Sequence, residues 1–212
     1  MKTHGFIISG IHSGVNKNKL AESIQKYKKD LTYKYLDPCL NVQKTQTDNY
    51  ITVGHVTEKV MKKERRGDYL GATVQVTPHI TSAIREFLTD SDNDTISVIG
   101  GNLGDIENVV AIEAVREMSH HLNVKILMYA PVIYLKAVGE LKTKPVQHAV
   151  KEAMKSGLHP HALCLMCDKK PEESEMNKIE LFTAVPKNNI VWHSKPDLDD
   201  CGKRLASILY KK

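Results

Sequence analysis

Aromatic residues are scarce in this sequence, at 6% of 212 residues with a single tryptophan. A protein that binds single-stranded nucleic acid by stacking bases on side-chain rings needs more of them. We therefore do not expect nucleic acid as a partner, although the net charge of +5 favours anionic ligands in general. Apolar runs long enough to cross a membrane are also missing, and the apolar run within the first ten residues, MKTHGFIISG, is too short for a signal peptide. The sequence thus predicts a soluble, cytoplasmic protein with no membrane partner.

Cysteine is rare as well, and nothing in its spacing indicates a disulfide framework. The four residues are Cys39, Cys164, Cys167 and Cys201. The close pair Cys164 and Cys167 follows two histidines, so a zinc site is conceivable, but a second pair with suitable spacing is missing. The same stretch, HALCLMC, equally fits a buried strand, and we expect no protein-bound metal there.

Short apolar runs alternate with amphipathic segments nearly from end to end. Expected strands cover 4–10, 32–36, 95–101, 124–132, 161–167 and 178–185, and expected helices cover 18–29, 55–66, 78–88, 105–122, 145–157 and 198–212. Continuous apolar strands separated by such helices indicate a parallel sheet covered on both faces. The sequence therefore predicts a single α/β domain over 1–212, mostly parallel and Rossmann-like, with a polar loop at 41–50 and an exposed excursion at 168–178.

Parallel sheets bind ligands where loops leave the carboxyl ends of their strands. In the first such loop, Gly10, Ser13 and Lys17 provide small residues and a cation at a helix start, as in a phosphate loop. The pattern G-x-x-x-x-G-K-[ST] is incomplete, because Asn16 and Asn18 flank the lysine. An ordinary strand-to-helix turn therefore remains an alternative.

Two further loops carry charged residues. In IGGNLGDIEN, three glycines allow close backbone approach to a ligand, while Asp105 and Glu107 could either bind that ligand or cap the next helix. In VGELKTKPVQHAV, Lys142 and Lys144 precede Pro145, which could open a helix. The paired cations indicate an anionic ligand.

Several long segments resemble, in the same order, the synthetase (amidoligase) domain of CTP synthase. They are LDPCLNV (36–42), KKERRGDYLGATVQVTPHIT (62–81), GGNLGDIE (100–107) and YLKAVGELKTKPVQHAVKE (134–152). The resemblance extends to about residue 185. It implies a P-loop-type α/β fold and an enzyme that phosphorylates O4 of UTP with ATP and Mg²⁺. Ammonia from a separate glutaminase domain then displaces the phosphate.

The resemblance also implies a binding site for pyrimidine nucleoside triphosphates at a subunit interface of a tetramer. Its lysines suit the triphosphate of UTP or CTP, because charge-assisted hydrogen bonds can satisfy several negative charges. The residues implied are Ser13, Asp105, Ile106, Glu107, Lys142, Thr143, Lys144, Gln147 and Lys178, with Gly10 and Lys17 in the phosphate loop.

The sequence departs from the family where ATP and Mg²⁺ would be handled. Val98 stands where the family has a metal-binding carboxylate, and valine cannot ligate a hard cation. The segment 41–54 is too short to carry the second metal aspartate, and Tyr35 replaces a family lysine. A glutaminase nucleophile motif is absent too, so a catalytic residue cannot be assigned.

The main hypothesis is a catalytically impaired domain that binds CTP or UTP and senses CTP or modulates a CTP synthase. We expect no cofactor except Mg²⁺ as part of a nucleotide complex. The protein would form a homo-oligomer, a dimer or tetramer, or assemble with a full-length CTP synthase. One alternative is an active ligase that uses free ammonia or a partner glutaminase, with metal held by Asp37, Asp48, Asp105 and Glu107. Another is a structural subunit that assembles through residues 65–80.

Overall fold

A computed structural model describes residues 1–11, 14–137, 139–194 and 198–211. Strands and helices alternate along most of the chain. In order they are β1 (Thr3–Ser9), α1 (Lys17–Tyr27), β2 (Thr32–Asp37), β3 (Tyr50–Thr52), α2 (Val53–Arg65), η1 (Val76–Ile80), α3 (Thr81–Thr89), β4 (Thr95–Ile99), η2 (Ile106–Asn108), α4 (Val109–Ser119), β5 (Asn123–Pro131), β6 (Ile133–Leu135), β7 (Glu140–Lys142), α5 (Lys144–Lys155), β8 (Ala162–Met166), α6 (Glu173–Thr183), η3 (Lys187–Asn189), β9 (Ile190–His193) and α7 (Asp199–Tyr210).

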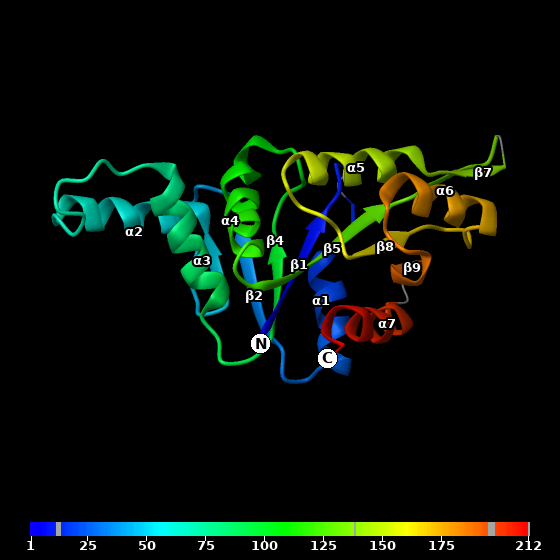
Figure 1. Ribbon diagram of the computed structural model, residues 1–212, viewed down its shortest axis with the longest axis horizontal. Coiled ribbons are helices and arrows are strands. Elements are labelled where there is room, and N and C mark those ends of the chain that lie inside the picture. The colour runs from blue at the N-terminus through cyan, green and yellow to red at the C-terminus, as the bar shows by residue number, and fades with distance from the viewer. Residues whose placement is uncertain (12–13, 138, 195–197, 212) are drawn as a thin grey trace.

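Seven parallel strands form the central sheet in the order β3-β2-β4-β1-β5-β8-β9 (Figure 1). β1 lies in the middle, and all seven of its residues are buried, as its apolar run predicts. β6 and β7 form a separate antiparallel hairpin. The predicted α/β fold with a mostly parallel sheet is confirmed.

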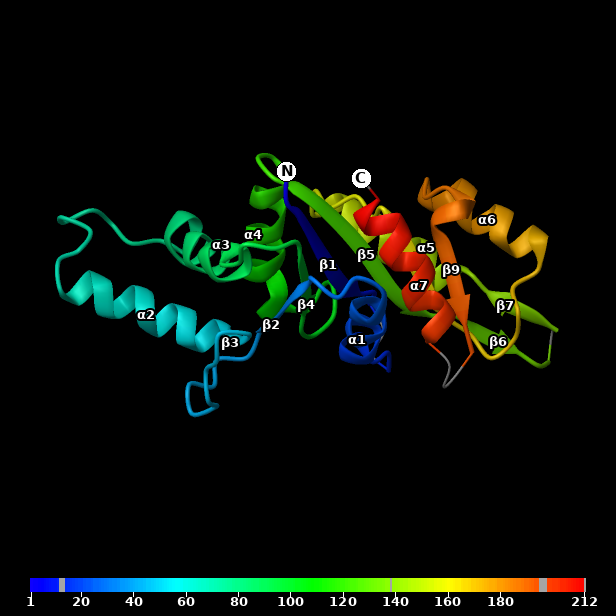
Figure 2. The same cartoon turned by 90° about the horizontal axis from the view of Figure 1, so that it is seen from below.

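Helices cover both faces of the sheet. One core packs α2 to α6 against one face, and the other packs α1 and α7 against the opposite face. Figure 1 shows α1 and α7 below the sheet and α5 and α6 above it. Figures 1 and 2 both show α2 at one end of the molecule and the β6–β7 hairpin at the other.

One expected strand is wrong. Residues 178–185 are not a strand, because α6 extends to Thr183 and begins inside the expected excursion 168–178. The buried positions of α6 are Glu175, Ile179 and Thr183, each four residues from the next, which is a helical spacing. The last strand of the sheet is instead β9, and neither β9, β3 nor the hairpin was predicted.

Backbone hydrogen bonds join the loops at the carboxyl edge of the sheet. The N–H of Leu103 donates to the Ser9 carbonyl (3.2 Å), and the N–H of Gly10 donates to that of Tyr129 (3.3 Å). The N–H of Gly100 donates to the Leu36 carbonyl (2.8 Å). The ends of β1, β2, β4 and β5 are therefore held together as one edge.

Within the part of the chain that the structure describes, no helix is long and apolar enough to span a bilayer.

Candidate functional site

The turn that follows β4 is the centre of the carboxyl edge. Gly101 has φ +61°, a left-handed conformation that suits glycine. The Asn108 side-chain amide donates to the carbonyls of Gly100 (2.7 Å) and Asn102 (3.0 Å), and a carboxylate oxygen of Asp105 accepts from the N–H of Asn102 (2.8 Å). Asp105 thus stabilises the turn, but its side chain makes no hydrogen bond that caps η2, which begins at the next residue, so the capping role expected as the alternative is not seen within the described residues.

Lys17 reaches this turn from the start of α1. Its Nζ atom donates to the Oγ atom of Ser9 (2.9 Å) and to the carbonyl of Gly101. Burial lowers the pKa of Lys17 to about 8, and the negative charge of Asp105 only partly opposes this effect. The expected phosphate-loop lysine is therefore at the edge, but its ammonium is engaged by the protein itself.

Elsewhere in the first loop, Gly10 and Asn16 have structural roles. A Cβ atom added to Gly10 would lie 2.9 Å from the Cβ atom of Ala149 on α5, so Gly10 permits close helix packing. The side chain of Asn16 caps α1 by accepting from the N–H of Lys19 (3.0 Å). Ser13 lies outside the described residues, and its expected role stays a prediction.

The hairpin and the start of α5 bring a second group of expected residues together. Lys142 ends β7 and forms an ion pair with Glu140. Thr143 follows, and its Oγ1 atom accepts from the side-chain amide of Gln147 (3.0 Å), with both residues buried. Lys144 is the exposed first residue of α5. α5 therefore begins where Pro145 predicted a helix start.

α6 adds Lys178 to this group. The carboxylate of Glu175, buried on α6, accepts from the N–H of Leu141 in the hairpin (2.8 Å). Lys178 lies one turn further along α6, and its charge helps lower the pKa of Glu140, after the larger effect of Lys142. Lys142 thus pairs with Glu140, and the charge of Lys178 acts on the same carboxylate.

Asp105, Ile106 and Glu107 lie beyond the glycine turn. Ile106 is 83% exposed, which is unusual for an apolar side chain of this size, and Glu107 is exposed as well. Within the described residues, no hydrogen bond or ion pair joins this turn to the hairpin group. The expected site residues thus form two groups, one at the turn and one at the hairpin.

Comparison with known proteins bears on both groups. The family model of the CTP synthase N-terminus matches residues 42–201. The chain belongs to this family. It is 43% identical to the CTP synthase of Agrobacterium fabrum over 153 residues, covering 69% of this chain and 28% of that protein. It is also 35% identical to the CTP synthase of Aquifex aeolicus over 235 residues, covering 92% of this chain and 44% of that protein. The chain spans less than half the length of these relatives.

A CTP synthase-like domain raises the question of Mg²⁺, and the residues present do not fit it. Val98 is fully buried in the core beneath α1 and α7, and its register partners are Tyr35 and Ile7. Within the described part of the chain, no group of three or more His, Cys, Asp or Glu side chains could hold a metal. Cys164 lies in the apolar core, so HALCLMC contains the buried strand β8, as the strand alternative predicted.

Sequence reasoning missed a group of contacts around Asp37, at the end of β2. Its carboxylate accepts from Lys44 Nζ (2.8 Å), Tyr50 Oη (2.9 Å) and the N–H of Cys39 (3.0 Å). Burial alone would raise the pKa of Asp37, but the hydrogen bonds, that of Lys44 foremost, lower it to about 2. The LDP motif drew attention to Asp37, but nothing in the sequence pointed to Lys44.

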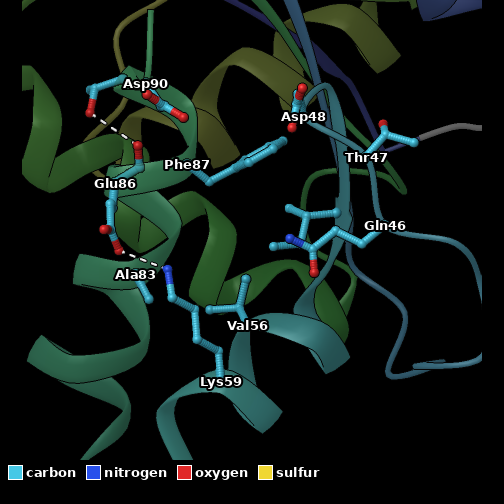
Figure 3. A pocket seen from close by; sticks show the side chains of 11 residues that line it. Gln46, Thr47, Asp48, Val56, Lys59, Ala83, Glu86, Phe87 and Asp90 are labelled. Atoms are coloured by element: carbon cyan, nitrogen blue, oxygen red, sulfur yellow. Dashed lines mark hydrogen bonds and ion pairs between the residues drawn. The ribbon is translucent and has the colours of Figure 1, made fainter. Parts of the chain in front are cut away.

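A pocket of ≈ 460 Å³ lies between α2, α3 and residues 46–48 (Figure 3). Lys59 and Glu86 form an ion pair across it (3.1 Å), and the Phe87 ring lines it. Behind it, the buried Nζ atom of Lys34 donates to the Asp48 carbonyl (2.7 Å) and lies 4.9 Å from the Phe87 ring centroid. The pocket was not expected, and Lys34 ties the loop to β2 at Asp48.

Proposed function

We propose that this chain is a CTP synthase-like synthetase domain that binds CTP and UTP, is catalytically impaired, and acts in the cytoplasm as a nucleotide sensor or as a modulator of a CTP synthase. The observation that carries the proposal is the grouping of Lys142, Lys144 and Lys178 at the hairpin. Three lysines from β7, α5 and α6 suit a triphosphate, because each offers charge-assisted hydrogen bonds to phosphate oxygens.

The turn after β4 supplies the base-recognition part of the proposal. The carboxylates of Asp105 and Glu107 only accept hydrogen bonds when ionised, and the exposed Ile106 side chain offers an apolar surface to a ring. The 4-amino group of cytosine donates, whereas O4 of uracil accepts. A pocket with carboxylates at this position therefore favours CTP over UTP.

The proposed loss of activity follows from the carboxyl edge. Phosphoryl transfer depends on positioning and on neutralisation of phosphate charge by metal ions and lysine. Here Lys17 is bonded to Ser9 and Gly101, and Val98 provides no ligand. We expect little or no CTP formation from UTP, ATP and ammonia, assayed by chromatography with Mg²⁺ and with Mn²⁺. Rapid formation of CTP would overturn the proposal that the chain is catalytically impaired, and would favour the active-ligase alternative.

Calorimetric titration with CTP, UTP, ATP and GTP tests the binding itself. We expect heat with the pyrimidine triphosphates in the absence of ATP. Lys144→Ala should weaken that binding by about 1.5–3 kcal/mol, the usual size of a hydrogen bond to a charged group. Lys151→Ala, an exposed lysine on the same helix, is the matched control and should change nothing. Absence of heat with CTP and UTP from folded protein would contradict the proposal.

A further inference from the structure

The strand β9 forms one edge of the sheet, and its outer side is open. The strand order leaves β9 with a single neighbour, β8, and within the described residues no other strand pairs with it. The opposite edge, β3, lies at the end of the molecule from which α2 projects (Figures 1 and 2). An open strand edge can pair with a further strand unless the protein covers it.

The backbone groups of β9 point alternately toward β8 and toward the open side. The carbonyl of His193 accepts from the N–H of Cys167 (3.0 Å), and His193 is in register with Met166, so its backbone groups face β8. The N–H and carbonyl groups of Ile190 and Trp192 therefore face the open side.

Two of these four outward groups are already bonded within the chain. The N–H of Ile190 donates to the Lys187 carbonyl in η3, and the Trp192 carbonyl accepts from the thiol of Cys201 (3.2 Å). The Ile190 carbonyl and the Trp192 N–H have no hydrogen-bond partner among the described residues. One acceptor and one donor, two residues apart, are thus left on the open side.

The two unbonded groups match a second copy of the same strand. When two copies of β9 pair antiparallel about a two-fold axis at Val191, Ile190 of each copy lies opposite Trp192 of the other. In such a pair the N–H of each Trp192 donates to the Ile190 carbonyl of the other copy. The same surface then serves both copies, and the contact closes on itself, as in a two-fold dimer.

Charged side chains of α7 lie beside this edge. A pocket of ≈ 530 Å³ lies between β9 and α7, and its α7 residues Asp200, Lys203, Arg204 and Ser207 have the spacing of one helix face. The other flank of α7 packs on α1, where Asp199 pairs with a lysine, so the pocket lies on the outer flank (Figure 2).

The charges on this outer flank are exposed and complementary to themselves. Asp200, Lys203 and Arg204 form no ion pair with any residue that the structure describes. An antiparallel second copy of α7 places basic residues opposite the acidic first turn, and the acidic first turn opposite basic residues. The surface therefore needs no partner of different chemistry.

We propose that β9 and α7 form a two-fold contact with a second copy of this chain, in which the two β9 strands pair antiparallel and Asp200 of each copy pairs with Arg204 of the other. The contact needs no nucleotide, and it is separate from residues 65–80, which lie at the α2 end of the molecule. Because β9 has only four residues, the interface is small, so the dimer should dissociate on dilution.

Hydrogen exchange of the Trp192 amide, measured by nuclear magnetic resonance without nucleotide, tests the contact at its centre. This N–H has no acceptor among the described residues, so it should exchange rapidly in dilute protein. Its exchange should slow as protein concentration rises, in step with the mass from light scattering. Fluorescence of Trp192, the single tryptophan, provides a second signal at the same place. Exchange that is equally fast at every concentration, with or without a rise in mass, would overturn the proposal.

Charge reversal tests the pairing of the two helices. Arg204→Asp leaves two acids on the outer flank, and Asp200→Arg adds a third base, so each variant alone should associate about tenfold more weakly than wild type or worse. An equimolar mixture should restore association, because the acids of one variant then meet the bases of the other. Lys151→Asp, at an exposed lysine on α5, is the matched control and should associate as the wild type does.

A mixture that associates no better than either variant alone would contradict the proposed pairing. Circular dichroism establishes that each variant is folded. If either is not, the exchange measurement on the wild-type chain decides the proposal, because it needs no substitution.

Discussion

The Nζ atom of Lys17 lies 2.9 Å from the Oγ atom of Ser9, whose hydroxyl in turn donates to the Gly101 carbonyl (2.7 Å). Lys17, the expected phosphate-loop lysine, therefore donates to the end of β1 and to the turn after β4. A ligand that is to use Lys17 must compete with these two acceptors. The arrangement makes the protonation state of Lys17 measurable through stability.

We expect the stability difference between wild type and Lys17→Met to change with pH. The pKa of Lys17 is about 8 in the folded protein against an ordinary 10.5. Between these values the unfolded chain binds more protons than the folded one, so the wild type gains stability relative to Lys17→Met as pH rises from about 8 to 10.5. Urea unfolding across that range measures the gain. Lys19→Met, an exposed neighbour, should track the wild type, and equal pH slopes for wild type and Lys17→Met would contradict the prediction.

The stabilisation that Asp37 provides is instead lost at low pH. Its pKa of about 2 lies below the ordinary 3.8, so the stabilisation by its three donors is complete above about pH 4 and is lost as the pH falls toward 2. A shift of this size corresponds to about 2 kcal/mol. Asp37→Asn should therefore cost about 2 kcal/mol in urea unfolding at neutral pH, and the cost should shrink on acidification. Asp92→Asn, at a fully exposed carboxylate, serves as the control and should be near neutral at every pH.

These contacts mark the limit of what the sequence could predict. The turn at Gly100–Gly101 and the helix start at Lys144 were found because glycine and proline act locally. Lys44 was missed because its contact with Asp37 depends on how an irregular loop closes, which no periodicity encodes. The replacement of a family carboxylate by Val98 can be read from one position of the sequence, whereas the ion pair between Lys44 and Asp37 can be read only from the three-dimensional structure.

The misassigned segment 178–185 has a physical explanation too. The run KIELFTAV is rich in residues typical of strands, and local propensity favoured a strand. Tertiary contacts decided otherwise, because Ile179 packs into the core beside α5 and Glu172 and Glu175 form a capping box at the helix start. The helix therefore begins at Glu173, inside the stretch 168–178 that was expected to be an exposed excursion.

The glycine turn itself can be tested by substitution. Gly101→Ala places a Cβ atom 2.9 Å from the Asn108 amide nitrogen and 3.2 Å from Cγ of Pro38, at φ +61°. Gly139→Ala has a similar φ of +68° but meets no atom within 4 Å. Left-handed strain should lower the free energy of unfolding by about 1–2 kcal/mol in both variants. Chemical unfolding should show a larger loss for Gly101→Ala than for Gly139→Ala, because only Gly101 has close neighbours. Equal losses would show that Pro38 and Asn108 move aside without cost.

Assembly provides the last prediction. The segment after α2 carries Leu70, which is 96% exposed, and Val76, which is 55% exposed, and Figure 2 shows α2 projecting away from the sheet. Exposed apolar side chains on a projecting arm are typical of an interface. Lysines gathered at the hairpin repel like charges on another subunit until an anion neutralises them. A triphosphate that is bound only by the assembled form must then stabilise it by mass action.

We therefore expect at least a dimer, and a shift toward the larger species, up to a tetramer, when CTP or UTP is added. Light scattering coupled to size exclusion, with and without each nucleotide, measures the change. Leu70→Lys should weaken association while leaving the sheet intact, because Leu70 makes no core contact within its own chain. An oligomer whose size does not change when CTP or UTP is added would favour the structural-subunit alternative. A monomer under every condition would instead indicate that the arm pairs only with another protein, for which a full-length CTP synthase is the candidate to test by co-elution.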